Sequence, residues 1–472
     1  MKAALTHGAY SSRSLGANAQ RCINLFTEAN PEDSPFPVTH YPAPGLRKLG
    51  TSPNNLGYRC LSRTKTTGEL FAVCGNQVYQ ISSSWVFTLR GTMISSSGMV
   101  SMADNGFEIL IVDGTAKGYT IDLVTKAFAS VTDPNFYGGT RVDVSDTYFV
   151  LNRPGTNNWY ISLTNEAVWN PLDIASKTSL PDPLQTVFCI SDNIVTLGSL
   201  STEVWYNTGA SDFTYQKVTG VLIEHGTVAP YSLGKYESTA FWLSQNEQGQ
   251  SIVLRMGGFA VERVSTHAIE EAFRNYPVVN DAVGFCYQIA GHAFYQITFP
   301  TADKTWVWDD AEKQWHERCS IDSSGIHHRH AAQVCAFAFG VNVCGDWQNG
   351  NLYAFDLSTY TDNGSPILYL RSWPHMEEEA KRLTFRTFIA EMDAGNASGD
   401  ANPMVSLRWS DDRGSSFGEP VLMPLGQAGQ YDTTIQWWGL GLGRFRVFEL
   451  SWSEPVKTAL LGAYVDVLVH KT

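Results

Sequence analysis

The middle of this 472-residue chain is a series of similar units, and their recurrence restricts the fold more than any other feature. In each unit an apolar run is followed by a Gly or Asn turn, an aromatic-containing run, a polar turn and a third run. The second runs are spaced by roughly 40–50 residues, which is the range of propeller blades. They are centred near Val78, Tyr119, Tyr160, Val204, Val253, Trp306 and Leu352. Short alternating strands with tight turns are what a four-stranded blade requires.

We therefore predict an all-β chain in which residues 51–362 form a β-propeller of about seven blades, with six or eight also open. The alternative is a set of ordinary β-hairpins from two sandwiches. The ring is favoured because stacked units bury a continuous core, whereas isolated hairpins do not.

The two ends of the chain differ from the repeats. Residues 1–50 contain Pro31, Pro35 and Pro37, which exclude a helix, so we expect an extended Pro-rich arm with short strand-like anchors. A turn-rich stretch near residue 362 marks a boundary. Residues 363–472 hold about six apolar–polar alternating runs, which predict a C-terminal antiparallel β-sandwich-like domain.

The charge of the chain restricts its relation to nucleic acid. The net charge is −13, from 46 acidic and 33 basic residues. This balance argues against wrapping around DNA by phosphate neutralisation. An acidic wall would still let a duplex slide past without sticking, because it repels phosphate.

Cysteine usage and hydropathy indicate the compartment. The eight cysteines include no pair spaced as Cys-x-x-Cys, and most stand in apolar strand-like runs, so we interpret them as buried free thiols made in a reducing cytoplasm. No signal peptide is expected at the N-terminus, and no apolar run is long enough to predict a membrane span.

Two local patterns could carry chemistry. Residues 410–417 fit the Asp-box pattern Ser-x-Asp-x-Gly-x-Ser-Phe, in which Asp412 is expected to bond backbone N–H groups of a tight hairpin. That role is structural. His327, His328 and His330 form the one His cluster, and His328 and His330 would share a strand face that could hold a metal. A surface or interface loop is the favoured interpretation, and we assign no metal site.

The remaining searches assign no catalytic residue, no cofactor-binding residue and no cofactor. Trp437 and Trp438 could form a sugar platform, although strand packing explains them equally. The Gly-rich residues 439–444 precede a strand, so we expect close backbone approach between sheets or subunits there rather than a phosphate site.

Two stretches near the ends of the chain resemble a known family. Residues 21–28, Arg-Cys-Ile-Asn-Leu-Phe-Thr-Glu, precede a Pro-rich gap and residues 41–46, Tyr-Pro-Ala-Pro-Gly-Leu; residues 444–448 and 453–466 add a second match. They are similar to the tail-nozzle proteins of short-tailed bacteriophages, also called packaged-DNA stabilisation or head-completion proteins.

The resemblance implies a structural protein of the virion tail, synthesised in the host cytoplasm, and not an enzyme. It implies a homo-hexameric nozzle that extends the DNA channel below the portal and its adaptor, retains packaged DNA and passes it during ejection. The implied partners are the adaptor and portal proteins, a tail needle or plug, a tailspike or fibre, and double-stranded DNA that passes without specific binding. The alternative is a β-propeller that binds or cleaves glycans in the manner of a sialidase.

Overall fold

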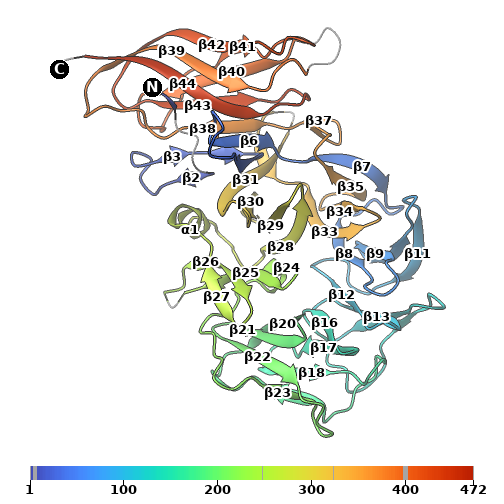
Figure 1. Ribbon diagram of the computed structural model, residues 1–472. Coiled ribbons are helices and arrows are strands. Elements are labelled where there is room, and N and C mark those ends of the chain that lie inside the picture. The colour runs from blue at the N-terminus through green and yellow to red at the C-terminus, as the bar shows by residue number, and fades with distance from the viewer. Residues whose placement is uncertain (1, 4–7, 247, 323, 397–401, 471–472) are drawn as a thin grey trace.

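The computed structural model describes residues 2–3, 8–246, 248–322, 324–396 and 402–470 (Figure 1). The fold is all-β, with a propeller and a C-terminal β-sandwich, as predicted. The described residues include one α-helix, α1 (His267–Arg274), which lies between two blades and is capped at its N-terminus by the hydroxyl of Thr266. None of the described helices is long and apolar enough to cross a membrane.

The propeller has seven four-stranded blades, in agreement with the predicted number. The chain runs from the innermost strand outward in blades 1 to 6. The strands are β8 (Tyr58–Arg63), β9 (Leu70–Cys74), β10 (Gln77–Ile81) and β11 (Phe87–Thr92) in blade 1; β12 (Ser101–Asp104), β13 (Glu108–Val112), β14 (Gly118–Asp122) and β15 (Phe128–Ser130) in blade 2; β16 (Val142–Ser145), β17 (Tyr148–Asn152), β18 (Asn158–Ile161) and β19 (Ile174–Ser176) in blade 3; β20 (Leu184–Ile190), β21 (Asn193–Gly198), β22 (Thr202–Asn207) and β23 (Tyr215–Lys217) in blade 4; β24 (Gly234–Tyr236), β25 (Thr239–Gln245), β26 (Ser251–Gly257) and β27 (Ala260–Arg263) in blade 5; β28 (Val283–Ile289), β29 (His292–Phe299), β30 (Lys304–Asp309) and β31 (Gln314–Ile321) in blade 6; and β33 (Ala332–Ala338), β34 (Val341–Asp346) and β35 (Asn351–Asp356) in blade 7.

Each pair of neighbouring blades shares an apolar core. Between blades 1 and 2, for example, Phe71 and Val73 pack with Ile109 and Ile111, and all four side chains are buried. Burying such a side chain contributes about 1.5–3 kcal/mol relative to leaving it exposed. The ring is therefore held together by contacts between units that follow each other in the sequence.

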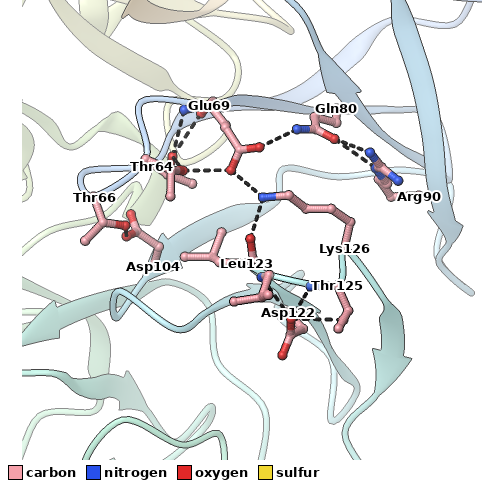
Figure 2. Close-up of polar contacts among 12 residues, drawn as sticks. Thr64, Thr66, Glu69, Gln80, Arg90, Asp104, Asp122, Leu123, Thr125 and Lys126 are labelled. Carbon is pink, nitrogen blue, oxygen red and sulfur yellow. Dashed lines mark hydrogen bonds and ion pairs between the residues drawn. The ribbon is translucent and has the colours of Figure 1, made fainter.

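A polar network adds a second link between blades 1 and 2 (Figure 2). Glu69 accepts hydrogen bonds from Lys126 at 2.5 Å and from Gln80 at 2.6 Å, and Gln80 in turn accepts from Arg90 at 3.0 Å. Lys126 belongs to a turn of blade 2 whose backbone N–H groups are capped by Asp122. Burial alone would raise the pKa of Glu69, but these hydrogen bonds lower it. The carboxylate therefore stays charged and joins the two blades.

The seventh blade is completed by a strand from the other end of the chain. Its fourth strand is β7 (Gly45–Thr51), which pairs antiparallel with β35, so that Leu46 faces Phe355. Most of β7 lies within the stretch expected to form the arm. It closes the ring because it supplies hydrogen bonds that β35 would otherwise lack at its open edge.

The C-terminal part is a sandwich of two sheets packed over one core (Figure 1). Both sheets include strands from the N-terminal region. One sheet contains β42 (Ile435–Gly443), β39 (Leu383–Met392), β44 (Leu460–Val469), β6 (Val38–Pro42) and β5 (Leu25–Ala29), and the other contains β4 (Cys22–Ile23), β38 (Tyr369–Ser372), β43 (Val447–Trp452), β40 (Met404–Ser410) and β41 (Val421–Pro424).

The expected arm thus contains a hairpin rather than one extended strand. Strands β5 and β6 pair antiparallel, and the proline-rich residues 30–37 form the connecting loop. Asn30 closes this loop, because its side-chain amide donates to the carbonyl of Phe36 and to the hydroxyl of Thr39, both at 2.8 Å. Pairing within the arm satisfies backbone groups that an isolated extended segment would leave to water.

Candidate assembly interface

The seam between propeller and sandwich is built by the N-terminal strands. Strand β4 pairs with β31, the outermost strand of blade 6, and with β38 of the sandwich, so one sheet runs from the propeller into the sandwich. In Figure 1 the blue strands lie between the propeller below and the red sandwich above. The arm therefore positions the two parts of the molecule relative to each other.

Asn24 is the hydrogen-bonding centre of this seam. Its side-chain amide donates to the carbonyls of Cys319 and Leu368, both at 2.9 Å, and its side-chain oxygen accepts from the backbone N–H of Cys319 at 3.0 Å. The residue is buried and has a φ of 54°, a left-handed conformation that asparagine tolerates better than most residues. One side chain thus joins the arm, blade 6 and the linker before the sandwich.

Arg371, in the sandwich, binds residues of the arm. Its guanidinium is fully buried and donates to the carbonyls of Gly8 and Arg21 and to the side-chain oxygen of Gln20, the last at 2.8 Å. Burial lowers the pKa of Arg371. Carbonyl oxygens that accept from a buried guanidinium recover part of the hydration it has lost.

The outer face of the sandwich carries an exposed apolar stripe. Trp438 is 64% exposed, and Leu442 and Leu468 are about half exposed. The strand register places Leu442 and Leu468 on either side of Thr384 across β42, β39 and β44, and places Trp438 opposite Thr387. Large exposed apolar side chains gathered on one sheet are typical of interaction surfaces.

The two consecutive tryptophans have different roles. Trp437 is buried in the sandwich core, where its ring contacts Phe388 and its indole N–H donates to the carbonyl of Val421 at 2.8 Å. Trp438 points to the opposite face, as strand alternation requires. Strand packing therefore explains Trp437, while Trp438 remains available at the surface.

The Gly-rich stretch is explained by backbone conformation. Gly439 and Gly441 have φ values of 66° and 81°, and among the described residues, their immediate chain neighbours aside, no atom lies within 4 Å of where a Cβ would stand. The close approach between sheets that the sequence suggested is therefore absent at these two glycines within this chain. They are required because β42 passes through left-handed positions there.

The Asp-box turn has the structure expected of it. Asp412 accepts from the hydroxyls of Ser410 and Ser416, both at 2.6 Å, and from the backbone N–H of Ser416 at 2.8 Å, while Gly414 has a φ of 89°. The hydrogen bonds from Ser410 and Ser416 lower the pKa of Asp412 to about 2. The turn connects β40 and β41, so its role is local.

The histidine cluster does not converge on one site. The side chain of His328 is 43% exposed and lies between Asp303 at 2.7 Å and Asp322 at 3.5 Å. His330 is buried beyond the end of β32 (His327–Arg329), where burial lowers its pKa to about 3. The prediction that His328 and His330 share a strand face was wrong, because β32 ends before His330. Across the described residues, no group of three His, Cys, Asp or Glu side chains could hold a metal ion.

Two family models match the chain. The model described as "Bacteriophage P22 Gp10, beta-propeller" matches residues 1–360, and "Bacteriophage P22 Gp10, beta-sandwich" matches residues 369–468. The chain belongs to the P22 Gp10 family. It is thus a bacteriophage structural protein of the virion, from a family of tail and head-completion proteins.

The stretches that carried the resemblance to phage proteins meet in one place in this P22 Gp10 family member. Cys22 and Leu25 come from the N-terminal stretch, and Phe448 and Leu460 come from the C-terminal one. All four are buried in the sandwich core. The sandwich core therefore depends on both ends of the chain.

Three solved structures that are similar to this P22 Gp10 family member are distant in sequence. The WD40 β-propeller domain of Doa1 is 9% identical, with a TM-score of 0.41. The match covers 66% of this chain and 97% of the Doa1 chain. The β-propeller domain of Cps50 (Swd1) from Myceliophteria thermophila is 9% identical, with a TM-score of 0.43, and the coverages are 66% and 98%. A chain of the mitotic checkpoint complex is 9% identical, with a TM-score of 0.43, and the coverages are 70% and 95%. No curated protein matches the chain.

Proposed function

We propose that this protein forms the hexameric nozzle at the distal end of the tail of a short-tailed phage. It would extend the DNA channel below the portal and its adaptor, retain the packaged genome and let it pass during ejection. The observation that carries the proposal is the match of both halves of the chain to the P22 Gp10 family. A needle or plug would close the channel, and a tailspike or fibre would dock outside.

The seam supports a mechanical role of this kind. A nozzle subunit must transmit force between neighbours without letting its own domains separate. Here the arm is part of the sandwich core and also of a propeller blade, so separating the two parts would require pulling out buried strands. The exposed stripe of Trp438, Leu442 and Leu468 offers a surface for contact with a neighbouring subunit.

The distribution of charge supports a conduit. Residues 1–362 hold 33 acidic and 23 basic side chains, while residues 363–472 hold 13 and 10. Most of the acidic excess thus belongs to the propeller-containing part. We propose that this part faces the lumen, where negative charge would repel DNA phosphates over a Debye length of roughly 8–10 Å.

The nozzle proposal can be tested on the purified protein and on the particle. We expect light scattering to give a mass six times the 52.2 kDa of one chain, and electron images to show a six-fold ring. Phage particles that lack this protein should package DNA but leave it sensitive to nuclease. A stable monomer at all concentrations, together with nuclease-resistant DNA in the deficient particles, would contradict the proposal.

The conduit can be tested separately. We expect the isolated protein not to bind duplex DNA at physiological salt, because an acidic wall offers phosphates no partner. Fluorescence anisotropy with a labelled duplex measures this. Submicromolar binding that weakens steeply with added salt would contradict the acidic conduit while leaving the ring intact.

A further inference from the structure

A cavity of about 270 Å³ lies on the axis of the propeller. Its walls come from or adjoin the innermost strands of six of the seven blades. Three cationic side chains, Arg59, Arg141 and Lys235, are among the lining residues, and no carboxylate is. Thiols also line it, but burial raises the pKa of Cys60 to about 12, so this thiol is neutral at pH 7.

Two of the three cations, Arg59 and Lys235, already have strong partners in the chain. All five N–H groups of Arg59 are used, by the backbone carbonyls of Gly75, Ser95, Ser97 and Gly98 and by the hydroxyl of Ser95. Lys235 forms an ion pair with Asp143. Arg59 therefore contributes a fixed positive charge, and Lys235 is neutralised.

Arg141 is the cation that pairs with no carboxylate among the described residues. Among the residues that the structure describes, its side chain makes one hydrogen bond, to the carbonyl of Leu233 at 3.5 Å, and it takes part in no ion pair. The carboxylate that acts on it most strongly is Asp143, which Lys235 already occupies. Arg141 is partly buried, and this burial lowers the pKa of its guanidinium.

The charges do not balance around the cavity. Asp113 is the carboxylate that acts most strongly on Arg59. Asp143 acts most strongly on Arg141 and forms the ion pair with Lys235. Three cations therefore face two carboxylates, which leaves one net positive charge in a site that is partly withdrawn from water. Buried charges in folded proteins are normally paired. An anion from outside would supply the missing charge.

We propose that the axial cavity binds a small oxyanion, a phosphate or a carboxylate, on the guanidinium of Arg141. A guanidinium presents parallel N–H donors that match the geometry of both groups. The volume suffices for such an ion with water, since one water molecule occupies roughly 30 Å³ of liquid. A second cavity, of about 410 Å³, adjoins the first and shares Arg59 and Gln333 with it.

The test uses the full-length protein and two anions. The melting temperature is measured during titration with sodium phosphate or sodium acetate, with ionic strength held constant by sodium chloride. We expect a saturable rise of about 2 °C or more with at least one anion. A response to phosphate alone, to acetate alone or to both would support the site and identify the oxyanion that it prefers.

Two variants and a control make the test specific. Arg141→Gln should abolish the response and, without added anion, should melt at or above the wild-type temperature, because it removes an uncompensated charge. Arg141→Lys should keep part of the response, and the exposed Lys117→Gln should keep all of it. The proposal is overturned if neither anion raises the melting temperature at concentrations up to about 50 mM. It is also overturned if Arg141→Gln responds as the wild type does.

Discussion

The ring of blades and the seam are stabilised in different ways. In the ring, each core joins blades that follow each other in the sequence, as Phe71 joins Ile109. In the seam, Asn24 binds Cys319 and Leu368, and Arg371 binds Gly8, which are partners hundreds of residues apart. The ring is thus modular, because the loss of one contact weakens one interface. The seam depends on a few side chains that each connect several parts.

The largest expected effect comes from removing the arm. A variant without residues 1–48 loses β4, β5, β6 and half of β7, so we expect a β-rich protein whose sandwich and propeller are no longer held together and which fails to join tails. Far-UV circular dichroism, limited proteolysis and complementation of deficient phage measure these properties. Infectious particles built with the truncated chain would show that the seam is dispensable.

The next effect concerns the centre of the seam. Asn24→Ala leaves the buried backbone groups of Cys319 and Leu368 without partners, so we expect a loss of about 2–4 kcal/mol in the free energy of unfolding. Asn24→Gly is the matched control, because glycine adopts a positive φ without strain but also lacks the side-chain amide. Denaturant unfolding gives both values. Wild-type stability of Asn24→Ala would mean that the seam is held elsewhere.

The seam should also respond to pH through Asp362, in the linker before the sandwich. Burial raises the pKa of Asp362 to about 7, against the partial effect of Arg318. The folded state therefore holds a proton that the unfolded state releases, so this contribution is present below about pH 4 and is lost as pH rises to 7. Asp362→Asn should raise the melting temperature more at pH 8 than at pH 5. An equal rise at both values would contradict the assigned pKa.

A smaller effect is expected within the ring. Glu69→Gln weakens the link from blade 1 to Lys126 of blade 2, and a partly exposed pair of this kind contributes about 0.5–1 kcal/mol. Lys126→Gln should cost a similar amount, and the double variant should cost less than the sum of the two. A loss as large as that of Asn24→Ala would remove the contrast between ring and seam.

The smallest effect is expected at the Asp-box turn. Asp412→Ala removes the acceptor for Ser410 and Ser416 in an exposed turn of the sandwich, so we expect a small fall in melting temperature and unchanged assembly. A melting temperature equal to that of the wild type within error would contradict the structural role of Asp412.

The sequence predicted the blades well and their inner strands poorly. The seven predicted centres, from Val78 to Leu352, each fall in the third strand of a separate blade. Most of these strands contain aromatic residues, and several of them begin directly after a Gly or Asn turn, as β10, β18 and β35 do. The innermost strands were missing from the predicted units. The shortest of them, β24 with Gly-Lys-Tyr and β16 with Val-Asp-Val-Ser, are too short to show a period.

The candidate sites could be predicted only where the chemistry is local. The Asp412 turn lies within eight residues, so spacing alone described it. Asn24 and Arg141 gave no signal, since the partners of Asn24 and the walls around Arg141 come from distant strands. Strand β7 was assigned to the arm for the same reason: nothing in Gly45–Thr51 indicates pairing with a strand about 300 residues later.

The position of β7 has a consequence for synthesis on the ribosome. This strand emerges among the first 51 residues, but its partner β35 ends at Asp356, so most of the chain must be translated before the ring can close. Until then β7 presents unpaired N–H and C=O groups that another nascent chain could capture. Completion of the ring is therefore a late and slow event in folding, since the contact spans such a long loop. In the hexamer proposed above, subunits would therefore associate only after that event.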